Sequence, residues 1–99
     1  MNNQLSSDQI FERVSDIIRE ALRVDKSKIV SEARIFNDLG AESLDVLDIR
    51  FNLEEEFGFK IQDNDMIRYL GKELSREEIM EFFTVGKITE YVKLRLEEK

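Results

Sequence analysis

The chain contains no proline and only four glycines among its 99 residues, and this shortage of chain-breaking residues restricts the fold more than any other feature. Proline removes a backbone donor and glycine loosens the backbone, so both are frequent in the turns of β-rich folds and rare inside helices. The sequence therefore favours an all-α fold over a turn-rich β sandwich. At this length one domain with one core is expected, over residues 1–99.

The chain has neither cysteine nor histidine, and this excludes most kinds of enzymatic site. Without cysteine there is no disulfide, no thiolate zinc site and no thiol nucleophile. Without histidine there is no Ser–His pair and no common general base near neutral pH. A carboxylate enzyme remains the only catalytic alternative, and no pattern places two carboxylates around a cleft. We therefore expect no catalytic residue and no metal site, and a thioester would need sulfur from a cofactor.

The formal net charge of −7 makes binding to nucleic acid or to anionic lipid improbable. No apolar run approaches the length of a membrane span, and residues 1–4 are neither basic nor followed by a signal-like apolar core. We expect a monomeric cytoplasmic protein with no stable membrane insertion.

Helical periodicity and capping residues predict where the helices lie. Residues 7–23 carry apolar side chains at spacings of three and four, with Ser7 or Asp8 as the expected cap. A second helix is predicted from Ser43 to Phe57, before Gly58. The long loop between these two helices is expected to be held down by apolar side chains at Ile29, Ile35, Phe36 and Leu39.

The last third of the chain is predicted to contain shorter helices. One is expected near residues 63–70, in a stretch of ambiguous pattern. An S-x-x-E capping box from Ser75 to Glu78 predicts another, and Thr84 would cap the final helix.

The most informative stretch runs from Asp38 to Asp45, with the sequence Asp-Leu-Gly-Ala-Glu-Ser-Leu-Asp. Gly40 allows a tight turn, and Ser43 follows at the expected N-terminus of the second helix. Unpaired N–H groups and the helix dipole favour a phosphate at such a position. For an arbitrary serine there, a simple capping role is the more common reading. A nucleophilic serine is excluded, because the stretch is not G-x-S-x-G and no histidine exists to activate it.

The second helix carries an acidic stripe with apolar residues on both sides. One flank contains Leu44, Leu47 and Phe51, and the other contains Val46, Ile49, Leu53 and Phe57. Two apolar flanks indicate a buried side and a second apolar contact, and ordinary core packing is the more common explanation of such a second contact. The stripe consists of Asp45, Asp48, Asn52, Glu55 and Glu56. Acids near the C-terminal end of a helix oppose its dipole, so recognition of a basic partner explains the stripe better than stability does. A merely solvated face is the alternative.

The run from Gly40 to Asp45, followed by Leu-Glu-Glu-Glu-Phe at residues 53–57, closely resembles the signature of acyl carrier proteins. In that family an Asp-Ser-Leu triplet opens helix II, and its serine receives phosphopantetheine from coenzyme A. The resemblance covers essentially the whole chain. It implies an acyl-carrier-like four-helix bundle, with a long loop between helices 1 and 2 and an extended segment before helix 4. It also implies a covalent 4′-phosphopantetheine on Ser43.

The resemblance further assigns roles to residues around Ser43. Partner enzymes of the family would be a phosphopantetheinyl transferase, an acyl-ACP synthetase, a ketosynthase and an acyltransferase. The residues matched to partner binding are Glu42, Leu44, Asp45, Asp48, Glu54, Glu55 and Glu56. Those matched to the acyl pocket are Leu47, Phe51, Ile88 and Val92.

Two departures from the family pattern bear on which kind of acyl carrier this chain resembles most. Glu42 stands where the family usually has aspartate, and the segment between Ile61 and Thr84 is longer than in carriers of fatty-acid synthesis. With this segment the chain looks most like bacterial carriers that deliver very long acyl chains to lipid A. The segment's apolar residues are expected to form a satellite core, with an extension of the acyl pocket as the alternative. They are Met66, Ile67, Tyr69, Leu70, Ile79, Met80, Phe82 and Phe83.

Two alternative functions remain open from the sequence. The first is a carrier of another cargo, either peptidyl or D-alanyl. The second is an unmodified acidic helical adaptor that uses the acidic stripe only to bind a partner.

Overall fold

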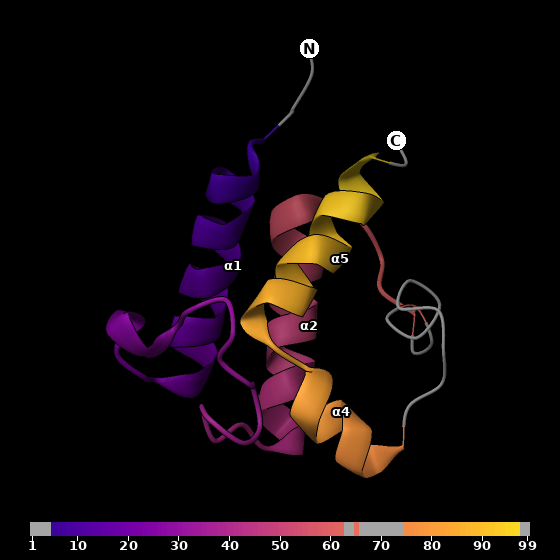
Figure 1. The fold of residues 1–99 in the computed structure, drawn as a ribbon. Helices are drawn as coiled ribbons and strands as arrows, with labels where there is room; N and C mark the ends of the chain where they lie inside the picture. The colour runs from indigo at the N-terminus through magenta and orange to yellow at the C-terminus, as the bar shows by residue number, and fades with distance from the viewer. Residues whose placement is uncertain (1–4, 63–64, 66–74, 98–99) are drawn as a thin grey trace.

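The computed structural model describes residues 5–62, 65 and 75–97 of the chain (Figure 1). Within this part the polypeptide is all-α, with a single isolated β-bridge between Arg34 and Thr84, which confirms the predicted fold class. The helices are α1 (Ser7–Leu22), the 3-10 helix η1 (Lys26–Lys28), α2 (Ser43–Phe57), α4 (Arg76–Phe82) and α5 (Val85–Glu97). The helix predicted near residues 63–70 falls almost entirely outside the described residues.

The first helix begins one residue earlier than predicted. Ser6, rather than Ser7 or Asp8, is the cap, because its extended backbone lets its hydroxyl accept the Gln9 N–H at 3.1 Å. The Gln9 side chain in turn accepts the Ser6 N–H at 2.8 Å. This reciprocal pair satisfies two N–H groups that the helix would otherwise leave without partners.

The other predicted helix boundaries are confirmed by their capping contacts. Gly58 ends α2 with a φ of 77°, in the left-handed region that glycine adopts without strain. Ser75 and Glu78 form the capping box of α4. Thr84 Oγ1 accepts the Lys87 N–H at 3.1 Å at the start of α5.

One hydrophobic core joins the helices and the long loop. Helix α1 packs against both α2 and α5, and the three run side by side in Figure 1. The helices contribute Ile10, Val14, Ile18, Ile49, Leu53, Val85, Ile88, Tyr91 and Val92, while the connecting segments contribute Ile29, Ala33, Ile35, Leu39, Phe59 and Ile61. The loop is therefore held down by apolar residues, as predicted, except that Phe36 is only partly buried.

The segment that leads into α2 is also bound to α4. The Ile35 N–H donates to the Phe83 carbonyl at 2.8 Å, and the rings of Phe36 and Phe83 lie 5.9 Å apart. Arg34 Nη1 donates to Glu81 at 2.8 Å, and Asn37 donates to the Met80 carbonyl at 3.3 Å. These contacts place α4 beside the start of α2 (Figure 1).

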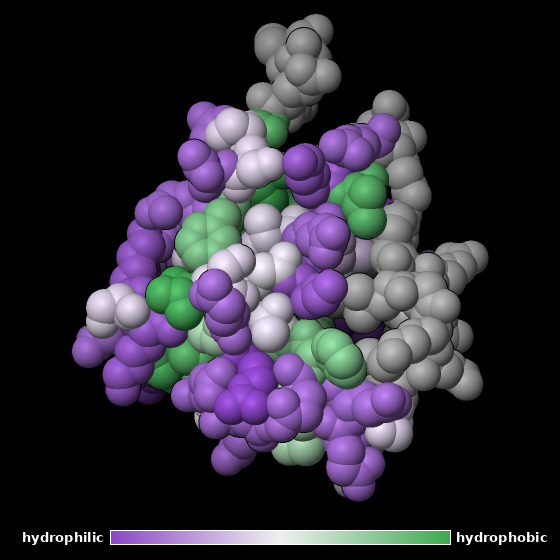
Figure 2. Space-filling model, viewed as in Figure 1, coloured by the Kyte–Doolittle hydropathy of each residue, from purple (hydrophilic) through white to green (hydrophobic). Residues whose placement is uncertain are grey.

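Hydrophilic side chains surround smaller apolar areas on the face shown in Figure 2. In the described part of the chain, no helix is long and apolar enough to cross a membrane.

Candidate functional site

Ser43 is the first residue of α2, and its side chain is exposed. The turn before it is held by backbone hydrogen bonds from Gly40 to Phe36 and from Ala41 to Ile35. Gly40 adopts a φ of 75°, which costs other residues about 1–2 kcal/mol. Buried Leu39 fixes this turn to the core. The serine hydroxyl is thus presented to solvent from a well-defined turn, at a helix end whose N–H groups favour an anion.

The acidic residues on either side of the serine, Glu42 and Asp45, form a capping box at the start of α2. The carboxylate of Asp45 accepts the backbone N–H of Glu42 at 2.9 Å, which is the N3-to-cap half of a capping box. Asp45 therefore helps to start α2, in addition to any role with a partner.

The remaining predicted acidic residues separate into two groups. Glu54 accepts the Ile61 N–H at 2.9 Å, and Glu56 pairs with Arg13 of α1 at 2.6 Å. Asp48 and Glu55 are exposed and form no ion pair within the part of the chain that the structure describes. These two carboxylates are therefore the ones left available to an external cation.

One apolar flank of α2 lies on the surface of the molecule. Leu44, Leu47 and Phe51 are 77%, 55% and 58% exposed, whereas Ile49 and Leu53 of the other flank are buried. The exposed flank begins next to Ser43 and lies beside the acidic stripe. Contiguous exposed apolar residues rimmed by charge are typical of an interaction surface.

A shallow groove of about 620 Å³ opens beside Ser43. Ser43, Glu42 and Ala41 form one wall, while Phe36 and the α4 residues Ile79 and Met80 form the rest. The apolar residues that precede α5 thus reach the candidate attachment site, which sequence periodicity alone did not predict.

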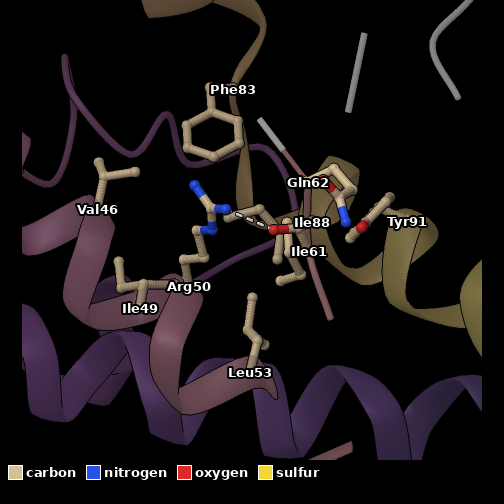
Figure 3. Close-up of a pocket in the computed structure, with 9 residues that line it drawn as sticks. All are labelled: Val46, Ile49, Arg50, Leu53, Ile61, Gln62, Phe83, Ile88 and Tyr91. Carbon is tan, nitrogen blue, oxygen red and sulfur yellow. Dashed lines mark hydrogen bonds between the residues drawn. The ribbon is translucent and has the colours of Figure 1, made fainter. Parts of the chain in front are cut away.

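A smaller apolar cavity of about 160 Å³ lies between α2 and α5 (Figure 3). Its α2 wall is formed by Val46, Ile49, Arg50 and Leu53, and the remaining lining residues are Ile61, Gln62, Phe83, Ile88 and Tyr91. Most of these side chains are apolar, so the cavity suits a hydrocarbon group.

Tyr91 joins one wall of this cavity to a polar network. Its hydroxyl donates to the buried Asp65 carboxylate at 3.1 Å, and Arg95 Nη1 donates to the same carboxylate at 3.0 Å. Arg95 also lies 4.4 Å from the centre of the Phe59 ring. Burial raises the pKa of Tyr91 to about 12, so this hydroxyl stays protonated through the physiological range. The network fixes the segment after α2 against α5.

The structure does not bring all four predicted pocket residues to this cavity. Ile88 lines it, Val92 is fully buried in the core, and Leu47 and Phe51 point to the surface. Phe83 lines the cavity too, while Ile79 and Met80 line the groove. Of the other residues suggested for a pocket extension, Phe82 is exposed. Met66, Ile67, Tyr69 and Leu70 lie outside the described residues. No group of metal-ligating side chains occurs in residues 5–62, 65 and 75–97.

Comparison with known proteins agrees with the helical architecture. Residues 12–69 match the family model of the phosphopantetheine attachment site, a span that includes the long loop and the whole of α2. These features define the class of protein as a helical domain with a phosphopantetheine attachment site.

A curated acyl carrier protein from Thermotoga maritima is 40% identical to the chain over 91 residues. The similarity covers 92% of this chain and 96% of that protein. The chain belongs to the acyl carrier protein family, as a non-catalytic carrier that bears phosphopantetheine.

Proposed function

We propose that Ser43 carries the phosphopantetheine and that the chain presents acyl thioesters to enzymes of fatty acid or lipid synthesis. The observation that supports this proposal best is the exposed Ser43 hydroxyl at the first position of α2, inside the span matched by the attachment-site family. The arm supplies the thiol that a chain without cysteine lacks. A tethered cargo stays at a high effective concentration for each enzyme that binds the carrier.

Intact-protein mass spectrometry tests the attachment. Wild-type protein incubated with coenzyme A and a phosphopantetheinyl transferase of broad specificity should gain one phosphopantetheine increment, and Ser43→Ala should gain none. Ser27→Ala is a matched control on the exposed η1 helix and should load like wild type. An increment on Ser43→Ala would contradict the assignment, and a folded wild type that never loads would favour the adaptor alternative.

Glu42 allows a second test of the same site. Since Glu42 replaces the aspartate usual in the family, we propose that Glu42→Asp accelerates loading by a broad-specificity transferase without changing the final mass. A slower reaction would show instead that this carrier is matched to a transferase that requires glutamate.

We propose that partner enzymes dock on the exposed side of α2. The supporting residues are Leu44, Asp48 and Glu55, which combine an exposed apolar side chain with two carboxylates that form no ion pair with any described residue. The partner classes are the transferase, an acyl-ACP synthetase, a ketosynthase and an acyltransferase. Glu42, Asp45, Glu54 and Glu56 would contribute to the negative potential of this surface. We also propose one carrier domain over residues 1–99, working as a monomer in the cytoplasm.

A narrower proposal is delivery of very long acyl chains to lipid A, supported by the sequence pattern around Ser43 and the longer segment between Ile61 and Thr84. A cavity of about 150 Å³ holds a molecule the size of benzene. The present cavity of about 160 Å³ is similar, so most of a very long chain would lie outside it or would have to enlarge it. Transfer of a very long chain to a lipid A precursor by its acyltransferase, absent with a short-chain cargo, would support this assignment.

A further inference from the structure

Among the described residues that line the apolar cavity between α2 and α5, Arg50 is the charged one. Figure 3 shows the Arg50 side chain extending from α2 toward Ile61, beside the ring of Phe83. Arg50 Nη2 donates to the Ile61 carbonyl at 2.5 Å, across the space between α2 and the segment that follows it. A guanidinium has only N–H donors and no acceptor, so this part of the cavity wall is polar among apolar neighbours.

Glu54, one helical turn after Arg50, binds the other side of the same peptide. Its carboxylate accepts the Ile61 N–H at 2.9 Å, while Arg50 donates to the Ile61 carbonyl. Both backbone polar groups of Ile61 are thus held by side chains of α2. The two side chains hold the buried Ile61 against α2. Arg50 and Ile61 both line the cavity, so this contact forms part of its wall.

We propose that Arg50 restricts the entry of saturated acyl chains into this cavity, an inference that rests on the proposed carrier function. An alkyl chain has no hydrogen-bond acceptor, so a chain that displaces Arg50 from Ile61 leaves the carbonyl without a donor and the guanidinium beside hydrocarbon. Both consequences are unfavourable in a partly buried site. The carrier therefore shelters saturated chains weakly, and Arg50 is the residue that limits their entry into the cavity.

The test compares carriers loaded with an octanoyl chain whose terminal methyl is labelled with ¹³C. The variants are Arg50→Met, which keeps an unbranched stem without charge, and Arg50→Leu, in case the first variant folds poorly. Arg13→Met is the matched control, because Arg13 also pairs with α2, through Glu56, but does not line the cavity. Octanoyl-pantetheine is attached from octanoyl coenzyme A, and loading of each protein is checked by mass.

We expect nuclear Overhauser contacts from the labelled methyl to Ile49, Leu53 and Ile88 to be several-fold stronger in both Arg50 variants than in wild type. The rise in Tm from the holo to the octanoyl form should also be larger in these variants, and Arg13→Met should behave like wild type.

Two results would overturn the role of Arg50 while leaving the carrier function intact. One is strong nuclear Overhauser contacts from the methyl in wild type, and the other is an equal increase of these contacts in Arg13→Met. Failure of all proteins to load would overturn the carrier proposal at Ser43 and this inference together.

Discussion

Asp45 and Asp48 lie three residues apart on α2, yet the described structure gives only Asp45 a hydrogen-bonded partner within the molecule. Asp45 accepts the Glu42 N–H at the start of the helix, whereas Asp48 is exposed and has no ion pair among the described residues. The same residue type therefore has two physical roles in one helix. Asp45 contributes to the stability of α2, and Asp48 is available to a partner.

We predict that Asp45→Ala lowers the free energy of unfolding by about 1 kcal/mol, because α2 loses one arm of its N-terminal cap. Asp48→Ala should leave stability unchanged within about 0.5 kcal/mol, as expected for an exposed side chain that pairs with no described residue. Urea denaturation followed by circular dichroism measures both. Equal losses in the two variants would contradict the separation of roles.

At the scale of elements, the segment that precedes α2 is held by one ion cluster. Arg34 donates from Nε and Nη2 to Asp38 at 3.0 Å, and its backbone N–H donates to the same carboxylate at 2.8 Å. The Arg34 side chain, followed by its backbone N–H, lowers the pKa of Asp38 below the ordinary value of 3.8. A carboxylate with a lowered folded-state pKa stabilises the fold above its unfolded pKa, and this contribution disappears as the pH falls through the folded value.

We therefore predict that Asp38→Asn has a lower Tm than wild type at pH 6, and that the difference narrows as the pH falls below 3.8. Thermal unfolding followed by circular dichroism across this range is the measurement. Glu55→Gln is the control, since it also removes one carboxylate but from an exposed position outside the ion cluster. A difference in Tm for Asp38→Asn that stays constant down to pH 2 would rule out the ion cluster as its cause.

Local signals in the sequence predicted the helices well. The caps at Ser75 and Thr84 and the stop at Gly58 depend on residues within four positions, so a single sequence displays them. The predicted start of α1 was one residue too late, because Ser6, Ser7 and Asp8 are all good caps. Ser6 is the cap because Gln9, three residues later, completes a capping box with it.

Contacts between distant parts of the chain could not be predicted in this way. The periodicity of α2 showed two apolar flanks, but it did not show that Val46, Ile49 and Leu53 face the cavity while Leu47 is exposed. The bond from Arg50 to the Ile61 carbonyl could not be predicted either, since it depends on how the following segment folds back. The pairing of Arg34 with Glu81, 47 residues away, likewise depends on tertiary structure.

At the scale of the whole molecule, a net charge of −7 without a described basic partner for Asp48 or Glu55 favours electrostatic association with a cationic surface. Raising the ionic strength from about 0.1 M to about 1 M shortens the Debye length from about 10 Å to about 3 Å. Interactions between exposed charges therefore weaken strongly over this range.

We predict that the affinity for a basic phosphopantetheinyl transferase falls several-fold between these salt concentrations. Glu55→Gln should bind the transferase more weakly than wild type at low salt, and its affinity should fall by a smaller factor when salt is added. Glu97→Gln, at the end of α5, should have the same affinity as wild type at both salt concentrations. Isothermal titration calorimetry gives the affinities. If the two variants respond alike, net charge rather than the α2 surface governs association.

The positions of Asp48 and Glu55 on α2 also define the geometry that a partner has to match. They are seven residues apart, so with a rise of 1.5 Å per residue they lie about 10 Å apart along the axis and on nearly the same side of the helix. Glu55 in turn lies about 18 Å along the axis from Ser43. An enzyme with two cations at the first spacing would fix the direction of the helix as well as its position. Enzymes that differ in chemistry would then receive the arm from the same point and at the same angle, so their active sites should lie at a common depth below their docking surfaces.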